Sequence, residues 1–288
     1  MGASFPHRTP ARLAAMRGEF LDVGGVRLYY YAAGRRGPEP PVVLLHGFAT
    51  SSHLWSNVVP LVAPHRRVVV LDLLGHGRSD RPNGQAVNLR GHADRVAELL
   101  DQLNVHRAVL VGHEAGGAVA MLLAVRHPLL VAALGLVSAV GHGDLPRREL
   151  RLARAMLPLT RTLPAGWLMS LLRSDLNRGY MEPDRAQRST DLYLRPFAGA
   201  EGRDALLEQL VHLDPADTQA LAARLEDIVA PTCVVWGEED PFVPVATGVR
   251  LAREIPGATA HPLPNVSHFS PEEAPEQVAS IILELIER

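Results

Sequence analysis

Three short segments of this 288-residue sequence gather the side chains that could carry out chemistry. The first is His46-Gly47-Phe48, the second runs from Gly112 to Gly117 around Glu114, and the third is Asp240 followed by His268. Each segment comes soon after a short apolar run that is typical of a buried strand. Carboxylates and imidazoles can move protons, and an activated carboxylate can also act as a nucleophile. These segments therefore supply the candidate functional residues.

Other chemistries are excluded by the residue types that the sequence lacks. All 29 of the Lys+Arg residues are arginine, which rules out Schiff-base chemistry, covalent pyridoxal phosphate and a P-loop lysine. The single cysteine, Cys233, allows neither an internal disulfide nor a multi-cysteine zinc site. The 13 histidines contain no ligand-spaced pair such as HExxH, so we predict no metal site and no cofactor.

Charge and hydrophobicity indicate a soluble globular protein. The net charge of -2 lacks the basic excess that nucleic-acid binding needs. No apolar run reaches the roughly 18 residues of a membrane span. Residues 1–18 have no apolar signal-peptide core, so we expect a flexible N-terminal tail and a cytoplasmic protein. The oligomeric state is left open.

Strands and helices must alternate to position these segments. Glu19–Val23 and Val26–Ala33 flank two glycines and predict an antiparallel hairpin. Further strands are predicted at Val42–Leu45, Val68–Leu71, Ala108–Val111, Leu134–Val137, Cys233–Trp236 and Ala258–His261. The first three of these are Val/Leu runs without alternation, as parallel strands buried on both faces have. The pattern predicts an α/β fold with a doubly wound, mostly parallel sheet, whose ligands bind beyond the carboxyl ends of the strands.

Helical patterns separate these strands. Apolar residues at alternating steps of four and three place one helical face at Leu89, Ala93, Val96, Leu100 and Leu103. The last helix is predicted to open at Ser270-Pro271, with Glu273 completing a capping box. Residues 141–215 are strand-poor and helical, so we expect an inserted lid there. The lid would interrupt a core made of residues 19–140 and 216–288.

Longer stretches around the three segments resemble the α/β-hydrolase family. The matching stretches are PVVLLHGF, VVVLDLLGHGRSDRP, VLVGHEAGG, PTCVVWGEEDPFVPV and NVSHFSPEEAPEQV. The resemblance runs from about Glu19 to the end of the chain, apart from the predicted lid. In this family the nucleophile, the acid and the histidine follow one another along the chain, as Glu114, Asp240 and His268 do here.

The resemblance implies a role for each candidate residue. His268 is expected to be the general base, and Asp240 the carboxylate that orients the imidazole and stabilises its protonated form. The backbone N–H groups of Phe48 and Ala115 are expected to form an oxyanion hole. Three further histidines are expected to shape the surrounding loops: His46, His76 and His113.

The central residue of the elbow departs from the family's Gly-x-Ser-x-Gly pattern, because Glu114 replaces the serine. A carboxylate that attacks an ester gives a reactive mixed anhydride, whereas attack on an epoxide or alkyl halide gives an ordinary ester. Epoxide hydrolases and haloalkane dehalogenases of this family carry an aspartate here and use the second route. Glu114 thus indicates an epoxide-hydrolase-like attack on a small, mostly apolar substrate.

Neighbouring residues depart from both of these carboxylate-using patterns. Ala115 stands where the dehalogenase pattern has a halide-binding tryptophan, and Ala49 stands where the epoxide-hydrolase pattern has proline. In the predicted lid, Trp167, Tyr180 and Tyr193 are candidates to line the substrate pocket. The two tyrosines are also available as acids for epoxide opening.

Glu114 allows three other interpretations. Its carboxylate could accept the Phe48 and Ala115 N–H groups and pair with protonated His268, as an acid–base dyad for lyase or isomerase chemistry. It could instead disable a site that only binds ligand. It could also be an engineered replacement of an ordinary serine.

Overall fold

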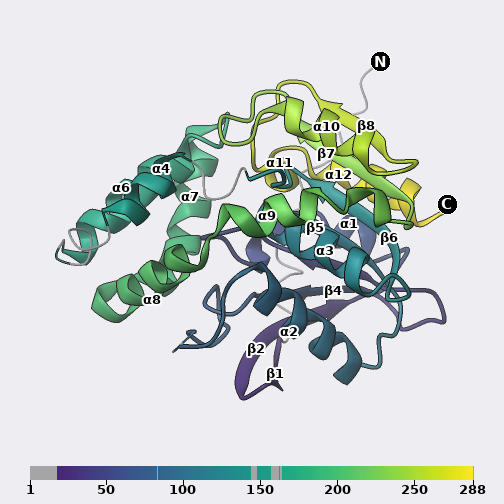
Figure 1. The fold of residues 1–288 in the computed structure, drawn as a ribbon, viewed down its shortest axis with the longest axis horizontal. Coiled ribbons are helices and arrows are strands. Elements are labelled where there is room, and N and C mark those ends of the chain that lie inside the picture. The colour runs from purple at the N-terminus through teal and green to yellow at the C-terminus, as the bar shows by residue number, and fades with distance from the viewer. Residues whose placement is uncertain (1–17, 83, 144–147, 157–161, 163, 288) are drawn as a thin grey trace.

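The fold is described from a computed structural model that places residues 18–82, 84–143, 148–156, 162 and 164–287 (Figure 1). The predicted N-terminal tail, apart from residue 18, lies outside the described residues. Among the helices of the described residues, none is long and apolar enough to cross a membrane.

One eight-stranded sheet forms the centre of the described chain, in the order β1-β2-β4-β3-β5-β6-β7-β8. The strands are β1 (Glu19–Val23), β2 (Val26–Ala33), β3 (Val42–Leu45), β4 (Val68–Leu71), β5 (Ala108–His113), β6 (Val131–Val137), β7 (Thr232–Gly237) and β8 (Thr259–Leu263). Strands β3 to β8 run parallel to one another, while β2 is antiparallel to both β1 and β4. The prediction of a mostly parallel α/β sheet is confirmed, and the differences lie at strand ends.

The β1–β2 hairpin depends on its two glycines. Gly24 and Gly25 have φ values of 61° and 81°, the left-handed region that a two-residue hairpin turn requires. Val23 pairs with Val26 directly beside this turn.

Both faces of the sheet are buried, which explains the unbroken apolar runs. In β3, Val42 and Leu44 belong to one apolar cluster, while Val43 and Leu45 belong to the other. Helices α1 (Val59–Val62) and α12 (Pro275–Ile286) pack into the first cluster. Helices α2 (Leu89–Gln102), α3 (Ala115–Arg126) and α10 (Val245–Glu254) pack into the second. The predicted helical face of α2 points into this second cluster.

Between β6 and β7 the described residues form a run of helices. They are α4 (Arg148–Ala155), α6 (Ala165–Asn177), α7 (Pro183–Leu194), η3 (Arg195–Phe197), α8 (Gly199–His212), α9 (Pro215–Ala222) and η4 (Leu225–Asp227). Helices α4, α6, α7 and α8 group together on one side of the molecule in Figure 1. Proline occupies the first turn of both α7 and α9, where its missing N–H costs no hydrogen bond.

The predicted capping box at Ser270 and Glu273 is wrong. The segment forms a short helix, α11 (Ser270–Glu273), before Pro275 starts α12. The buried Ser270 hydroxyl has no hydrogen-bond partner in the described part of the chain. The Glu273 carboxylate accepts instead from the N–H groups of Met181, at 2.6 Å, and Ser267, at 2.8 Å. Hydrogen bonds from N–H groups outside the helix therefore replace the predicted local cap.

Candidate active site

Glu114 sits in a sharp turn between β5 and α3. Its φ of 49° and ψ of -114° lie outside the regions that non-glycine residues ordinarily adopt. Two glycines make the turn possible: a Cβ on Gly112 would lie 2.2 Å from the Gly116 carbonyl oxygen, and one on Gly116 would lie 2.5 Å from that of His46. Strain of this kind persists where the surrounding structure enforces it, often at functional sites.

The Glu114 carboxylate occupies the predicted oxyanion hole. Its Oε2 accepts the backbone N–H of Phe48 at 2.6 Å and that of Ala115 at 3.3 Å. The side chain is 3 % exposed, so these bonds are shielded from water. Within the described residues, its Oε1 has no hydrogen-bond partner. Both donors therefore converge on one oxygen and leave the other free.

Asp240 and His268 form the second part of the candidate site. Nδ1 of His268 lies 2.8 Å from Oδ2 of Asp240. Asp240 Oδ1 accepts the N–H groups of Phe242, at 2.8 Å, and Val243, at 3.0 Å. Burial would raise the pKa of Asp240, but His268 and these two N–H groups outweigh it and hold the pKa below its usual range. The carboxylate is therefore ionised and fixed in place, which orients the imidazole.

The loop that carries His268 is attached to β5. His113, the residue before Glu114, places its Nε2 3.1 Å from the His268 carbonyl oxygen, and the two rings lie 4.6 Å apart. Burial keeps the pKa of His113 well below its ordinary value, so the ring is neutral. The elbow and the histidine loop are thus held together by one side chain.

Glu114 and His268 do not form a salt bridge with each other in the described residues. Among the described residues, Asp240 is the only carboxylate within 4.0 Å of a His268 nitrogen. The ion pair between Glu114 and His268 that an acid–base dyad would use is absent from this part of the chain.

His46 and His76 hold the loops that face Glu114, as predicted. His46 Nε2 accepts the Leu73 N–H at 2.9 Å, and His76 Nε2 accepts the Ala49 N–H at 3.2 Å. Burial lowers the pKa of His46 to about 4 and that of His76 to about 3, so both rings are neutral acceptors. The loop that provides the Phe48 N–H is therefore tied to the loop after β4.

Tyr180, in the loop between α6 and α7, and Tyr193, on α7, bind a carboxylate that sequence reasoning missed. Tyr180 donates its hydroxyl to Glu272 Oε1 at 2.8 Å, and Tyr193 donates to the same oxygen. Ser189 donates to Oε2 of Glu272. Burial first, and Glu272 second, raise the pKa of both tyrosines well above the ordinary value. Both hydroxyls are thus committed to Glu272.

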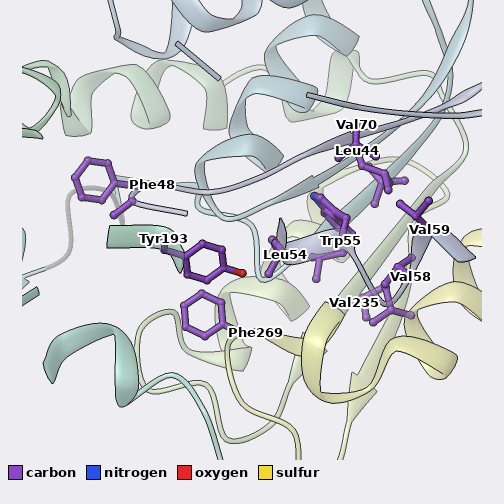
Figure 2. Close-up of a cluster of buried hydrophobic side chains, with 14 of the residues drawn as sticks. Leu44, Phe48, Leu54, Trp55, Val58, Val59, Val70, Tyr193, Val235 and Phe269 are labelled. Carbon is purple, nitrogen blue, oxygen red and sulfur yellow. The ribbon is translucent and has the colours of Figure 1, made fainter. Parts of the chain in front are cut away.

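Of the three predicted pocket residues, Tyr180 and Tyr193 lie together and Trp167 lies apart. Tyr193 and Phe269 lie beside each other in Figure 2, with ring centroids 6.3 Å apart, and Tyr180 stacks on Phe269 at 4.3 Å. Trp167 lies on α6 and is 67 % exposed, so it stands apart from this buried cluster. The sequence around a tryptophan does not show whether its side chain is exposed or buried, because that depends on what packs against its helix.

A narrow pocket of about 40 Å³ borders the oxyanion hole, and Gly47, Phe48 and Ala115 form part of its wall. Gln209 and His92 also line it and were not singled out from the sequence. No group of three potential metal ligands of the types His, Cys, Asp or Glu occurs within the described ranges. The pocket wall includes Phe48 and Ala115, whose N–H groups bind Glu114, but neither Glu114 nor His268 is part of it.

Comparison with known proteins identifies related chains. A family model described as the alpha/beta hydrolase fold matches residues 40–275. A 2-hydroxy-6-oxononadienedioate/2-hydroxy-6-oxononatrienedioate hydrolase of Paraburkholderia xenovorans is 29% identical, over 91% of this chain and 91% of its own. The dihydrolipoyllysine-residue acetyltransferase component of the acetoin cleaving system of Pseudomonas putida is 31% identical, over 93% of this chain and 68% of its own.

A solved structure resembles most of this chain. The enol-lactonase of Burkholderia xenovorans LB400 superposes with a TM-score of 0.77 at 25% sequence identity. The match covers 94% of this chain and 100% of that protein.

Proposed function

Because this chain belongs to the alpha/beta hydrolase fold family and is a hydrolase, we propose that Glu114 attacks a saturated carbon of a small, mostly apolar substrate. In the second step His268, oriented by Asp240, activates the water that releases the product. The observation that carries the proposal is the pair of N–H groups on one oxygen of Glu114, with the other oxygen unbonded among the described residues.

The first step uses the two carboxylate oxygens differently. Oε1 attacks a carbon of an epoxide, the ring C–O bond breaks, and the ring oxygen takes a proton from solvent. The result is an ordinary ester, in which Oε2 becomes the carbonyl oxygen. Since Oε2 already lies in the oxyanion hole, the ester forms without moving its carbonyl away from the N–H groups of Phe48 and Ala115.

The second step is hydrolysis of that ester. His268 removes a proton from water, and the resulting hydroxide adds to the Glu114 carboxyl carbon. The negative charge develops on Oε2, where the two N–H groups stabilise it. Collapse expels the product oxygen, which takes the proton from His268, and Glu114 returns its own proton to solvent. Epoxide and water thereby give a diol.

The same geometry argues against chemistry on a carbonyl substrate. The hydrolase relative is named for an oxo acid and the solved relative for a lactone, both of which are carbonyl compounds. In this chain Glu114 Oε2 accepts the hydrogen bonds from Phe48 and Ala115 that a substrate carbonyl would need. Acyl transfer to Glu114 would also give a reactive anhydride. We therefore propose that the substrate of this chain is not a carbonyl compound of the kind that those two names describe.

We propose that residues 141–215 form a lid over a core made of residues 19–140 and 216–288. Helix α8 contributes Gln209 and His212 to the wall of the pocket beside Glu114. Helix α7 contributes Ser189 and Tyr193 to the Glu272 cluster. These contacts support a lid over the carboxyl ends of the strands, where ligands of α/β proteins bind.

Single turnover in ¹⁸O-labelled water tests the covalent step. A panel of small aliphatic and aryl epoxides is screened first, and excess enzyme is then mixed with the best substrate. We expect ¹⁸O in the peptide that contains Glu114, because the attacking water leaves one oxygen on the carboxylate. Turnover without ¹⁸O in that peptide would contradict a covalent intermediate on Glu114.

A second candidate function is ligand binding without catalysis. It is favoured by the same bonds, since an occupied oxyanion hole is unavailable to substrate. This function predicts no turnover of any epoxide and unchanged ligand affinity in His268→Ala. Turnover that His268→Ala abolishes would contradict it.

A further inference from the structure

A second, wider groove lies outside the candidate active site. Its volume is about 860 Å³, and its wall is made by α7, by the segment around the 3₁₀ helix η2 (Ser52–Trp55) and by the loop after β4. Neither Glu114 nor His268 lines it. The volume falls in the range of small-molecule sites, so a ligand could bind here independently of the proposed reaction.

One face of α7 forms part of this wall and carries arginines. The lining positions are Arg185, Arg188, Ser189 and Leu192, which recur at steps of three and four. That spacing places them on one side of the helix, so the side chains of this face point towards the groove. Arg195, in η3, continues the same face and also borders a neighbouring cavity.

Arg78 brings a guanidinium group to the wall from the loop after β4. Its Nη1 donates to the Tyr29 hydroxyl at 2.6 Å, and its guanidinium carbon lies 4.8 Å from the centre of the Tyr29 ring. Tyr29 lines the groove as well. A hydrogen bond and a cation–π contact therefore hold this positive charge at the wall.

The two acidic residues of the wall bind groups of the protein itself. Asp72 and Glu272 are 1 % and 3 % exposed. The two oxygens of Asp72 accept the N–H groups of Ser52, at 2.6 Å, and Arg78, at 2.9 Å. Both oxygens of Glu272 accept hydroxyl groups, as described above. Since four arginines and two carboxylates of the described residues line the groove, its wall carries a net positive charge.

The arginines differ in the partners that they already have. Arg185 Nε lies 3.3 Å from Glu182 Oε2, which neutralises much of its charge. Arg78 and Arg188 have no carboxylate oxygen within 4.0 Å in the described part of the chain, and the Arg188 side chain has no hydrogen bond there. Both residues are exposed. Two cationic donors from different elements are therefore available to a ligand.

We propose that this groove binds the phosphate group of an organic phosphate monoester, with Arg78 and Arg188 as its donors. Guanidinium groups bind phosphate oxygens through paired, charge-assisted hydrogen bonds. A phosphate monoester offers three terminal oxygens in a tetrahedral arrangement, which suits donors that arrive from different elements. A carboxylate offers only two oxygens in one plane. The rest of the groove accommodates the organic part of the ligand.

The test compares phenyl phosphate, benzoate and phenol, which share one ring and are a dianion, a monoanion and a neutral molecule near pH 7.5. Dissociation constants are measured by NMR titration of the full chain in phosphate-free buffer, followed at the amides of Ser52, His53 and Ser189. We expect phenyl phosphate to bind about tenfold more tightly than benzoate, because it forms more hydrogen bonds to charged donors. Phenol should bind most weakly.

Variants of exposed arginines separate a built site from general attraction of anions. Arg188→Gln should weaken phenyl phosphate binding about tenfold, and Arg188→Glu should abolish it. Arg90→Gln is the matched control, because Arg90 is exposed on α2, has no partner among the described residues and does not line the groove. It should retain full affinity.

Four results would overturn the assignment. They are absence of binding at the three amides, benzoate binding as tight as that of phenyl phosphate, an unchanged affinity in Arg188→Gln, and an equal loss in Arg90→Gln. No turnover is measured, so the outcome does not depend on whether Glu114 forms a covalent intermediate.

Discussion

Glu114 differs from the serine of the usual elbow in both charge and reach. The extra length carries its carboxylate to the N–H groups of Phe48 and Ala115, which a serine hydroxyl would leave for the substrate. We propose that the residue that would inactivate an esterase serves here as an ester-forming nucleophile. In that mechanism the same bonds hold Oε2 where charge develops during hydrolysis.

His268→Ala is expected to trap the covalent intermediate. Without a base to activate water, the ester on Glu114 should form but hydrolyse very slowly. Mass spectrometry of the protein after incubation with a reactive epoxide should show one adduct, located on the peptide that contains Glu114. Glu114→Gln is the control, and an adduct that survives this change would point to a different nucleophile.

Shortening the nucleophile is expected to reduce the rate of ester formation. Glu114→Asp withdraws the carboxylate by one methylene, and misplacement near 1 Å costs on the order of a hundredfold in rate. Single-turnover kinetics should show this loss in the first step. A faster Asp variant would mean that the site is not adapted to glutamate.

Helix α11 is joined to α7 and to the loop before α7 by polar contacts that cross a long stretch of sequence. Glu272 accepts from Tyr180, Ser189 and Tyr193, and the Glu272 carbonyl accepts from Arg185. Because α11 starts two residues after His268, these contacts link the inserted helices to the histidine loop.

Glu272→Gln is expected to lower the free energy of unfolding by about 1–3 kcal/mol, since hydrogen bonds to a charged acceptor are replaced by weaker ones. Urea denaturation monitors the change. Glu276→Gln, at an exposed position on α12, provides the control and should be nearly neutral. Equal stability of the two variants would show that the Glu272 contacts contribute little.

The whole molecule buries several histidines in neutral form around the carboxyl ends of the strands. Burial lowers the pKa of His46 to about 4 and that of His76 and His92 to about 3, and it lowers the pKa of His113 as well. In the unfolded chain each titrates near 6.5. Between these values the unfolded state binds more protons than the native state does, so stability rises with pH there.

The free energy of unfolding is therefore expected to decrease as the pH falls from about 6.5 towards 4, with the neutral-pH contribution of each histidine being lost. Urea denaturation at successive pH values measures this slope. His76→Asn should make the slope shallower, whereas replacing the exposed His106 should leave it unchanged. A flat profile across this window would contradict the burial of neutral histidines.

The positions of all eight strands could be predicted, because they depend on local patterns. His46 and His76 were expected to shape loops, but their partners, Leu73 and Ala49, lie 27 residues away along the chain. The Ser270–Glu273 capping box could not be predicted correctly, since Met181 and Ser267 compete for the Glu273 carboxylate. The same holds for Glu272, whose tyrosine partners lie 79 and 92 residues away along the chain.

The chain's periodicity predicts a mostly parallel α/β sheet, because strand spacing is a local requirement. The resemblance of five stretches together implies the α/β-hydrolase fold, with Glu114 at the nucleophile position. Tertiary structure decides the direction of the Glu114 carboxylate. It also decides that, among the described residues, His268 pairs with Asp240 and not with Glu114. The hydrogen bonds from Tyr180 and Tyr193 to Glu272 depend on tertiary structure as well. Each of these depends on which distant backbone or side chain comes within hydrogen-bond distance. That proximity arises only when the strands and the inserted helices pack together.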